Sequence, residues 1–158
     1  MCRKFSVLYI ILFVVQFHIQ GQPRSLSHLG VEDGLSNSYI VDFAQDGQGF
    51  VWIATESGLN RFDGKSFTTY TKNNSDIVSN ELNTLLYDKS ENTIWIGSQR
   101  DGVSIFDCNS HSFTNLTLKE GLTTDDVTHL SHAEDGGIWI THYHVGVEHY
   151  NKESRELT

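Results

Sequence analysis

The tripeptide Val51-Trp52-Ile53 marks a repeat, because it returns twice in similar form, as Ile94-Trp95-Ile96 and Ile138-Trp139-Ile140. These copies hold every tryptophan of the chain, and the tryptophans lie 43 and 44 residues apart. In a β-strand, the two neighbours of a tryptophan point to the opposite face from it. Both faces of each copy are apolar, so each is expected to be covered on both sides. A fixed period of about 40–45 residues is typical of repeat architectures.

The sequence around each copy repeats as well. A glycine follows each tryptophan by six or seven residues, and four residues later comes an aromatic residue followed by Asp or Asn. The glycines are Gly58, Gly102 and Gly146, and the pairs are Phe62-Asp63, Phe106-Asp107 and Tyr150-Asn151. In the first copy, runs of β-type residues between turn residues predict four strands, at 39–45, 50–55, 59–62 and 66–71.

This pattern predicts an all-β chain made of β-propeller blades, with about three four-stranded antiparallel blades in an incomplete ring. The three tryptophans and the three glycines are predicted to form its structural core: Trp52, Trp95, Trp139, Gly58, Gly102 and Gly146. Three blades are fewer than the four to eight that propellers usually have. We therefore expect this chain to be the N-terminal piece of a longer protein, or to borrow blades.

The chain divides into a leader and the repeats. Residues 1–21 are predicted to be a signal peptide, because Arg3 and Lys4 precede an apolar run, although an uncleaved membrane anchor stays open. Residues 22–158 are predicted to form the partial propeller. Its parts are an outer strand at 25–30, blade one at 36–71, blade two at 79–117 and blade three at 123–158. The outer strand is inferred from the alignment of residues 26–29 with 113–116.

Charge and cysteine content exclude several classes of protein. The formal net charge of −9 repels nucleic acid, whose binding depends largely on contacts with phosphate groups. Cys108 is the only cysteine beyond the leader, so no internal disulfide and no cysteine-based zinc site is expected. Its place directly after Asp107, in a predicted turn, predicts a surface thiol. No cofactor and no metal are expected, because His129 and His132 fall on opposite faces of one predicted strand.

Three segments of the first repeat resemble the two-component regulator propeller repeat. They are residues 33–37 (DGLSN), 49–53 (GFVWI) and 58–64 (GLNRFDG). The resemblance implies the periplasmic sensor part of a hybrid two-component histidine kinase. Members of that family have many such blades, an immunoglobulin-like domain, a transmembrane helix, a kinase, a receiver and a DNA-binding domain, and their usual ligands are oligosaccharides.

For this chain, the resemblance implies a periplasmic location, with the full-length form anchored in the inner membrane. The implied partners are the missing blades and kinase part of the same receptor, and an oligosaccharide ligand. Membrane contact is expected only through the missing part or an uncleaved N-terminal segment. No catalytic motif is found, so the chain itself is not expected to be an enzyme. Two alternatives remain, a secreted propeller for protein contacts and a propeller carbohydrate-active enzyme.

Strand parity predicts which loops share a face. The turn between the second and third strands of a blade lies on the same side as the segment that enters its first strand. On that side, the candidate ligand-binding residues are Arg100, Asp101, His142, Tyr143 and His144. Rings offer a surface on which a sugar can stack, and guanidinium and carboxylate groups can bond its hydroxyls. Loops on a rigid scaffold are where such sites usually lie.

Overall fold

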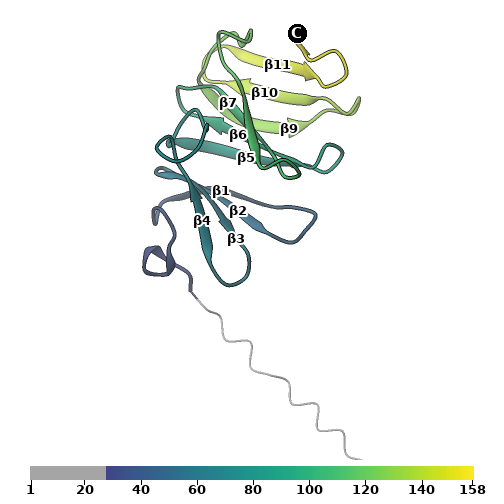
Figure 1. Ribbon diagram of the computed structural model, residues 1–158. Coiled ribbons are helices and arrows are strands. Elements are labelled where there is room, and N and C mark those ends of the chain that lie inside the picture. The colour runs from purple at the N-terminus through teal and green to yellow at the C-terminus, as the bar shows by residue number, and fades with distance from the viewer. Residues whose placement is uncertain (1–27) are drawn as a thin grey trace, which may run out of the picture.

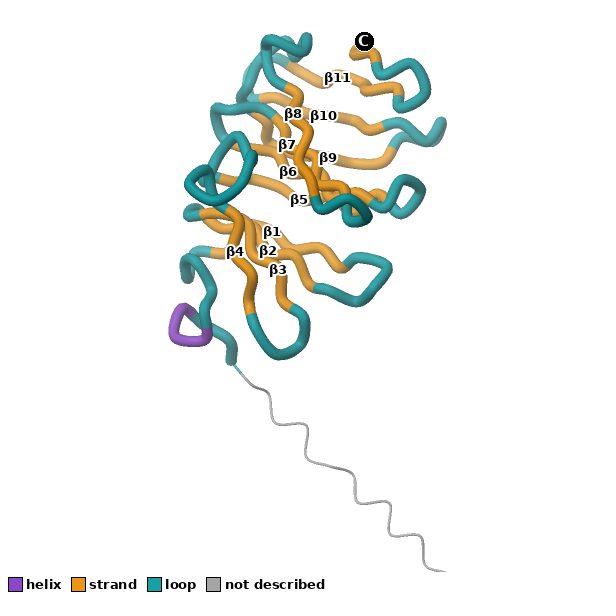
Figure 2. Tube along the Cα trace, in the orientation of Figure 1, coloured by secondary structure: helices purple, strands orange, loops and turns teal. Residues whose placement is uncertain are grey.

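The computed structural model describes residues 28–158, so the predicted signal peptide lies outside the described residues. The described chain is nearly all sheet, with three four-stranded antiparallel sheets that follow one another in sequence order (Figures 1 and 2). The first strand of the middle sheet, β5 (Leu82–Asp88), contacts β1 (Ile40–Gln45) on one side and β9 (Val127–His132) on the other. The predicted all-β fold of three four-stranded blades is confirmed.

Each blade is a meander in which consecutive strands pair. Blade one continues with β2 (Val51–Thr55), β3 (Gly58–Phe62) and β4 (Phe67–Tyr70). Blade two continues with β6 (Thr93–Ser98), β7 (Val103–Asp107) and β8 (Ser112–Leu116). Blade three continues with β10 (Ile138–His142), β11 (Gly146–Asn151) and β12 (Glu156–Leu157). A single 3-10 turn, η1 (Val31–Asp33), precedes blade one.

The repeated Asp or Asn after the aromatic residue of the third strand shapes the next turn. Asp63, Asp107 and Asn151 each accept hydrogen bonds from the backbone N–H groups two and three residues further on, at 2.7–3.2 Å. These bonds hold the pKa of the Asp63 and Asp107 carboxyls below the ordinary value. A side chain that bonds the backbone ahead of it favours a turn, so these residues end the third strand.

Two apolar clusters lie between neighbouring blades. Trp52 is 1% exposed in the cluster between blades one and two, and its ring centroid lies 4.9 Å from that of Phe106. Trp95 is 1% exposed in the cluster between blades two and three, and its ring centroid lies 5.2 Å from that of Tyr150. The tryptophan of one blade thus packs against the third-strand aromatic residue of the next.

Blade three corrects two of the predicted core positions. Trp139 is 40% exposed, because no blade covers its face among the described residues. Gly146 is exposed, and a Cβ built on it would meet no atom within 4 Å. Gly58 and Gly102 are buried against the ends of the fourth strands, with backbone carbonyl oxygens 2.7 and 2.4 Å from a built Cβ. The fourth strand of blade three, β12, has two residues and does not reach Gly146.

The outer strand predicted at 25–30 is described only from residue 28 onward, and residues 28–30 form no strand. An outer strand pairs with the third strand of its own blade, and none of the described third strands is free for it. The next residues, 30–35, form the same turn as residues 117–122. In both, a backbone hydrogen bond closes the turn, at 3.2 and 3.1 Å, and a glycine has φ 108°. The two regions that align in sequence are therefore followed by the same turn structure.

Cys108 is buried, which corrects the prediction of a surface thiol. It belongs to the cluster between blades one and two and is 7% exposed. Burial, with the nearby charges of Asp46 and Asp107, raises the pKa of its thiol to about 11. The sequence predicted that Cys108 lies in a turn, but it did not show that this turn of blade two packs against blade one.

Candidate functional site

Backbone hydrogen bonds join the loops of blades two and three on the predicted loop face. The Gln99 N–H donates to the Glu81 carbonyl at 3.1 Å, so the β6–β7 turn meets the segment entering blade two. The Gly102 N–H donates to Asp125 O at 2.8 Å, which ties the same turn to the connection into blade three. The Tyr143 N–H donates to the adjacent Asp126 carbonyl at 3.3 Å. The turns of blades two and three therefore meet at the connection between them.

Four of the five candidate ligand residues lie at the surface of this face. Arg100 and His144 are exposed, Tyr143 is 60% exposed, and Asp101 is half-buried. The Tyr143 and His144 rings lie 3.9 Å apart between centroids, at an interplanar angle of 57°. His144 has φ 61°, so the tight β10–β11 turn presents both rings at its tip.

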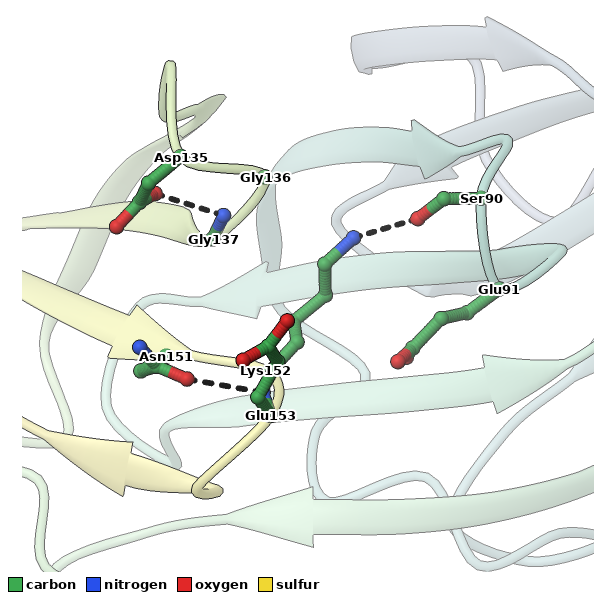
Figure 3. A pocket seen from close by; sticks show the side chains of 8 residues that line it. All are labelled: Ser90, Glu91, Asp135, Gly136, Gly137, Asn151, Lys152 and Glu153. Carbon is green, nitrogen blue, oxygen red and sulfur yellow. Dashed lines mark hydrogen bonds between the residues drawn. The ribbon is translucent and has the colours of Figure 1, made fainter.

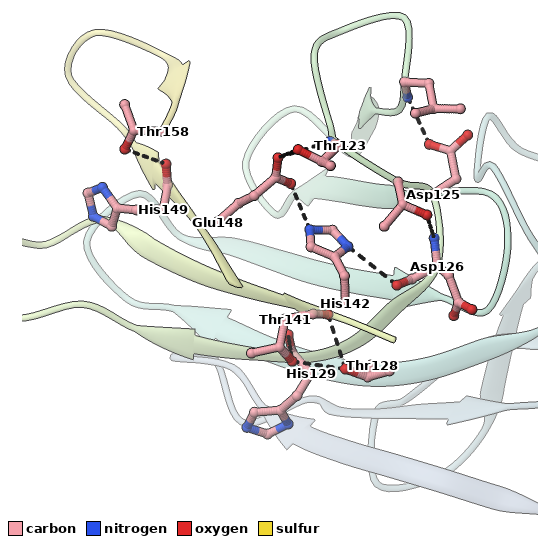
Figure 4. Close-up of polar contacts among 12 residues, drawn as sticks. Thr123, Asp125, Asp126, Thr128, His129, Thr141, His142, Glu148, His149 and Thr158 are labelled. Atoms are coloured by element: carbon pink, nitrogen blue, oxygen red, sulfur yellow. Dashed lines mark hydrogen bonds and ion pairs between the residues drawn. The ribbon is translucent and has the colours of Figure 1, made fainter. Parts of the chain in front are cut away.

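His142 is a correction, because its side chain is fully buried. Its Nε2 lies 2.7 Å from the Glu148 carboxylate and its Nδ1 lies 3.3 Å from the Asp126 carbonyl (Figure 4). Glu148 also accepts hydrogen bonds from the backbone and the hydroxyl of Thr123. With both ring nitrogens facing protein oxygens, His142 fixes the connection into blade three and does not face a ligand.

A hollow of about 420 Å³ opens on the loop face between blades one and two. Its lining residues are Tyr39, Val41, Glu56, Glu81, Leu82, Asn83 and Gln99. Glu56, Glu81 and Gln99 are exposed where they line the hollow, and among the described residues no hydrogen bond joins their side chains to another group. Tyr39 adds a ring that is 60% exposed.

None of the candidate ligand residues predicted from the sequence lines this hollow. One signal could have found part of it. Glu56, Gln99 and Tyr143 each follow their tryptophan by four residues, so they are equivalent positions on three successive turns. Tyr39 and Glu81 just precede their first strands, and only the packing of blade one against blade two brings them together.

A second hollow, of about 440 Å³, lies at the opposite edge, among the β5–β6, β9–β10 and β11–β12 turns (Figure 3). Its single basic group, Lys152, is bound by the protein. Lys152 Nζ lies 2.5 Å from Asp88 Oδ2 and 2.6 Å from Ser90 Oγ. Burial alone would raise the pKa of Asp88, but these hydrogen bonds from Lys152 and Ser90 outweigh it and lower the pKa. This edge is best explained as a tie between blades two and three.

Within residues 28–158, no group of three or more His, Cys, Asp and Glu side chains is placed to hold a metal ion. In the same part of the chain, no helix has the length and apolar character needed to cross a bilayer.

Comparison with known proteins finds a family match in the first repeat. Residues 34–57 match the family described as two component regulator propeller. The resemblance seen in the sequence is confirmed. The extracellular domain of a protein described as a hybrid two component system from B. thetaiotaomicron is 37% identical, with a TM-score of 0.78, over 84% of this chain. A second extracellular domain from B. thetaiotaomicron, described as belonging to a one component system, is 22% identical over 78% of this chain, with a TM-score of 0.67, and shows the fold alone.

A curated relative, histidine kinase P4 from Formosa agariphila, is 35% identical over 75 residues, or 48% of this chain. The chain spans 19% of the length of the more similar solved structure and 6% of the length of the kinase. The chain is therefore a propeller region related to the extracellular sensor parts of hybrid two-component histidine kinases.

Proposed function

We propose that this chain is part of the periplasmic ligand-sensing propeller of a hybrid two-component regulator, and that its loop face binds an oligosaccharide. The observation that carries the proposal is the polar hollow on the loop face, at the edge opposite the Lys152 tie. The 37% identity to an extracellular domain of a hybrid two component system supports the sensor assignment.

The chemistry of the hollow suits a neutral sugar. Glu56 and Glu81 carboxylates accept hydrogen bonds from hydroxyls, and the Gln99 amide both donates and accepts. Tyr39 in the hollow, and Tyr143 on the β10–β11 turn of the same loop face, offer rings on which a pyranose can stack. The two carboxylates disfavour an anionic ligand such as a phosphorylated or sulfated sugar, since like charges repel at short range.

Binding is tested by calorimetry of the purified chain against a panel of neutral oligosaccharides. Gln99→Ala, Glu81→Ala and Tyr143→Ala are expected to weaken binding at least about tenfold, because each removes a direct contact. The melting temperature should stay the same, since all three side chains lie at the surface. Glu153→Ala in the opposite hollow is the matched control and should bind like the wild type. If only Glu153→Ala lost binding, the ligand site would lie in the hollow at the opposite edge.

The same ligands distinguish a sensor from an enzyme. A sensor releases the bound oligosaccharide unchanged, and chromatography of the mixture after long incubation would show this. Shortened products would assign the hollow to a carbohydrate-active enzyme. Binding of protein partners with no glycan hit would favour a propeller for protein contacts.

Export is tested separately in a Gram-negative host. Arg3, Lys4 and the apolar run that follows are expected to direct the chain to the periplasm, where its N-terminus should be shortened. Retention of the full-length chain in the cytoplasm would contradict the periplasmic assignment. Fractionation followed by mass spectrometry of the N-terminus measures both.

A further inference from the structure

Each blade ties the segment that enters it to its own third strand through one side chain, which lies two residues after the repeated glycine. A backbone N–H of the entering segment donates a hydrogen bond to that side chain. The donor and acceptor are Ser36 and Asn60 in blade one, at 3.0 Å, Val78 and Ser104 in blade two, at 3.0 Å, and Thr123 and Glu148 in blade three, at 2.9 Å. The accepting side chain is thus neutral in two blades and ionisable in the third.

The position three residues after the tryptophan differs in the same way. Thr55 and Ser98 fill it with hydroxyl groups, whereas His142 fills it with an imidazole whose side chain is fully buried. His142 Nε2 lies 2.7 Å from Glu148 Oε2, and the Glu148 side chain is 12% exposed. Blade three therefore holds a buried ionisable pair where blades one and two have neutral groups.

The oxygens around the His142 ring set the number of protons that this pair holds (Figure 4). Nδ1 lies 3.3 Å from the carbonyl oxygen of Asp126, which can only accept a hydrogen bond. Nε2 faces the Glu148 carboxylate, which also accepts hydrogen bonds from the N–H and the hydroxyl of Thr123. Those two bonds favour the ionised form of the carboxylate. A neutral imidazole has one N–H, so only the protonated ring can donate to both oxygens.

The groups around the ring come from β9, β11 and the connection at 117–126. β9 places Val127 opposite His142, and β11 contributes Glu148. In the connection, Asp126 faces the ring with its main-chain carbonyl, and the neighbouring Asp125 carboxylate accepts a backbone N–H of the same connection at 2.8 Å. Within residues 28–158, no lysine or arginine forms an ion pair with Glu148. His142 is therefore the basic partner of this carboxylate.

The position of the Tyr143 turn depends on the same carbonyl, because the Tyr143 N–H also donates to Asp126 O, at 3.3 Å. We propose that His142 and Glu148 form a proton-dependent lock that positions the Tyr143 turn of the loop face. Histidine changes charge between about pH 5 and 8. Above that range the neutral ring keeps its N–H on Glu148 and turns the Nδ1 lone pair toward the Asp126 carbonyl. The two lone pairs repel, and the turn loosens.

The sign of the effect follows from this arrangement. The protonated form of His142 gains two acceptors in the folded chain, so the lock is closed at acidic pH and opens as the pH rises. Binding at the loop face should weaken in the same direction, because Tyr143 is one of its contact residues. This last step rests on the function proposed above. His142 acts there as a positioning residue and does not touch the ligand.

Hydrogen exchange of single amides, followed by NMR, tests the lock without any ligand. The protection factor, which corrects for the exchange rate of an unfolded chain at each pH, is compared for two equivalent amides. That of the Tyr143 N–H is expected to fall at least about tenfold between about pH 5.5 and 8.5. The control is the Gln99 N–H, which donates to the Glu81 carbonyl at 3.1 Å in blade two and has no histidine beside it in sequence. Equal responses of the two amides would overturn the proposal.

Glu148→Gln separates the proton from the shape of the side chain. The new amide can donate to Nε2, so a neutral ring can donate from Nδ1 to Asp126, and the Tyr143 N–H should stay protected at alkaline pH. His144→Asn is the matched control, because His144 is exposed beside Tyr143 and asparagine tolerates its φ of 61°. It should keep the wild-type response. A pH response that survives Glu148→Gln, or that disappears in His144→Asn, would overturn the lock.

A double variant, His142→Thr with Glu148→Asn, installs the neutral pair of blade one and should also remove the pH response. Calorimetry with the neutral oligosaccharide panel then connects the lock to binding. The wild-type affinity is expected to fall at least about tenfold between about pH 5.5 and 8.5, and that of Glu148→Gln should stay constant. Exchange that responds as expected while no oligosaccharide binds would support the lock and contradict the proposed function. Affinity that is independent of pH while the Tyr143 N–H responds would overturn the effect of the lock on binding.

Discussion

Trp95 and Trp139 occupy the same position in neighbouring blades and have the same apolar neighbours in sequence. Trp95 is 1% exposed because blade three covers it, whereas Trp139 is 40% exposed because none of the described residues covers it. The two strands pair equally well within their own sheets. Burial in this fold is therefore supplied by the next blade and not by the strand that carries the tryptophan.

Removing a covered tryptophan should cost far more than removing the open one. Trp52→Ala and Trp95→Ala each leave a cavity between two blades and are expected to lower the free energy of unfolding by about 3–5 kcal/mol. Trp139→Ala should lower it by less than about 1 kcal/mol, because its ring already meets solvent. Urea denaturation followed by circular dichroism, at a concentration where the chain is monomeric, measures all three. Equal losses would mean that the Trp139 face is covered in solution.

Alanine in place of the repeated glycines should likewise destabilise the chain more at the two covered positions than at the open one. All three have positive φ, so alanine costs backbone strain at each. At Gly58 and Gly102 the new Cβ would also collide with the carbonyl oxygen of Tyr70 or Leu116, which should add about 1–3 kcal/mol of destabilisation. Gly146→Ala has free space and serves as the control for strain alone. Thermal denaturation of the three variants measures the difference, and a similar melting temperature for all would contradict it.

The Lys152–Asp88 pair should stabilise the interface of blades two and three in a pH-dependent way. Lys152→Ala leaves the Asp88 carboxylate buried without its partner and should cost about 1–3 kcal/mol at neutral pH. The pKa of Asp88 is lowered in the folded chain, so its contribution is complete above the ordinary aspartate pKa and is lost as the pH falls through the lowered value. The stability difference between wild type and variant should therefore shrink below about pH 4.

Lys65→Ala is the control for this pair, because Lys65 is exposed at the open end and its removal should change stability by less than about 0.5 kcal/mol. Urea denaturation of the three proteins between acidic and neutral pH provides the comparison. A pH-independent loss in Lys152→Ala would show that the side chain acts by packing and not by charge.

The alkylation rate of the buried Cys108 thiol measures how readily the interface of blades one and two opens, and the measurement needs no substitution at that interface. The pKa of its thiol is raised to about 11 by burial, so almost none of it is thiolate at neutral pH and alkylation should be slow. Trp52→Ala loosens the same cluster and should speed the labelling. Trp139→Ala should leave the rate unchanged. Mass spectrometry of the chain after treatment with iodoacetamide measures the labelling rate. Rapid labelling of the wild type would show that this interface opens readily.

Much of the fold could be predicted from the sequence. The period of the tryptophans gave the blades, and the predicted strand at 50–55 is β2 (Val51–Thr55). The Asp or Asn after each third strand ends that strand by bonding the next backbone N–H groups, an effect confined to four residues. Such effects involve residues that are close together in the sequence, so the strands and turns could be predicted.

The candidate site was less accessible to sequence. The tips Arg100, Tyr143 and His144 were found because strand parity places alternate turns on one side. His142 was placed there by the same rule, yet it is buried against Glu148 and Asp126. The hollow itself needs Tyr39 and Glu81, which lie on different blades. A pattern within one repeat cannot show which side chains of two different blades come into contact.

The repeat, the strand order within each blade and the chemistry of both blade faces follow from alternation and turn residues over a few positions of the sequence. The packing of the blades against one another sets which of those faces are buried. It buried Trp52, Trp95, Cys108 and His142, and it left Trp139, Phe43 and Gly146 open. Apolar burial requires a second sheet, and in the two buried interfaces that sheet comes from residues about 40 positions away in the sequence.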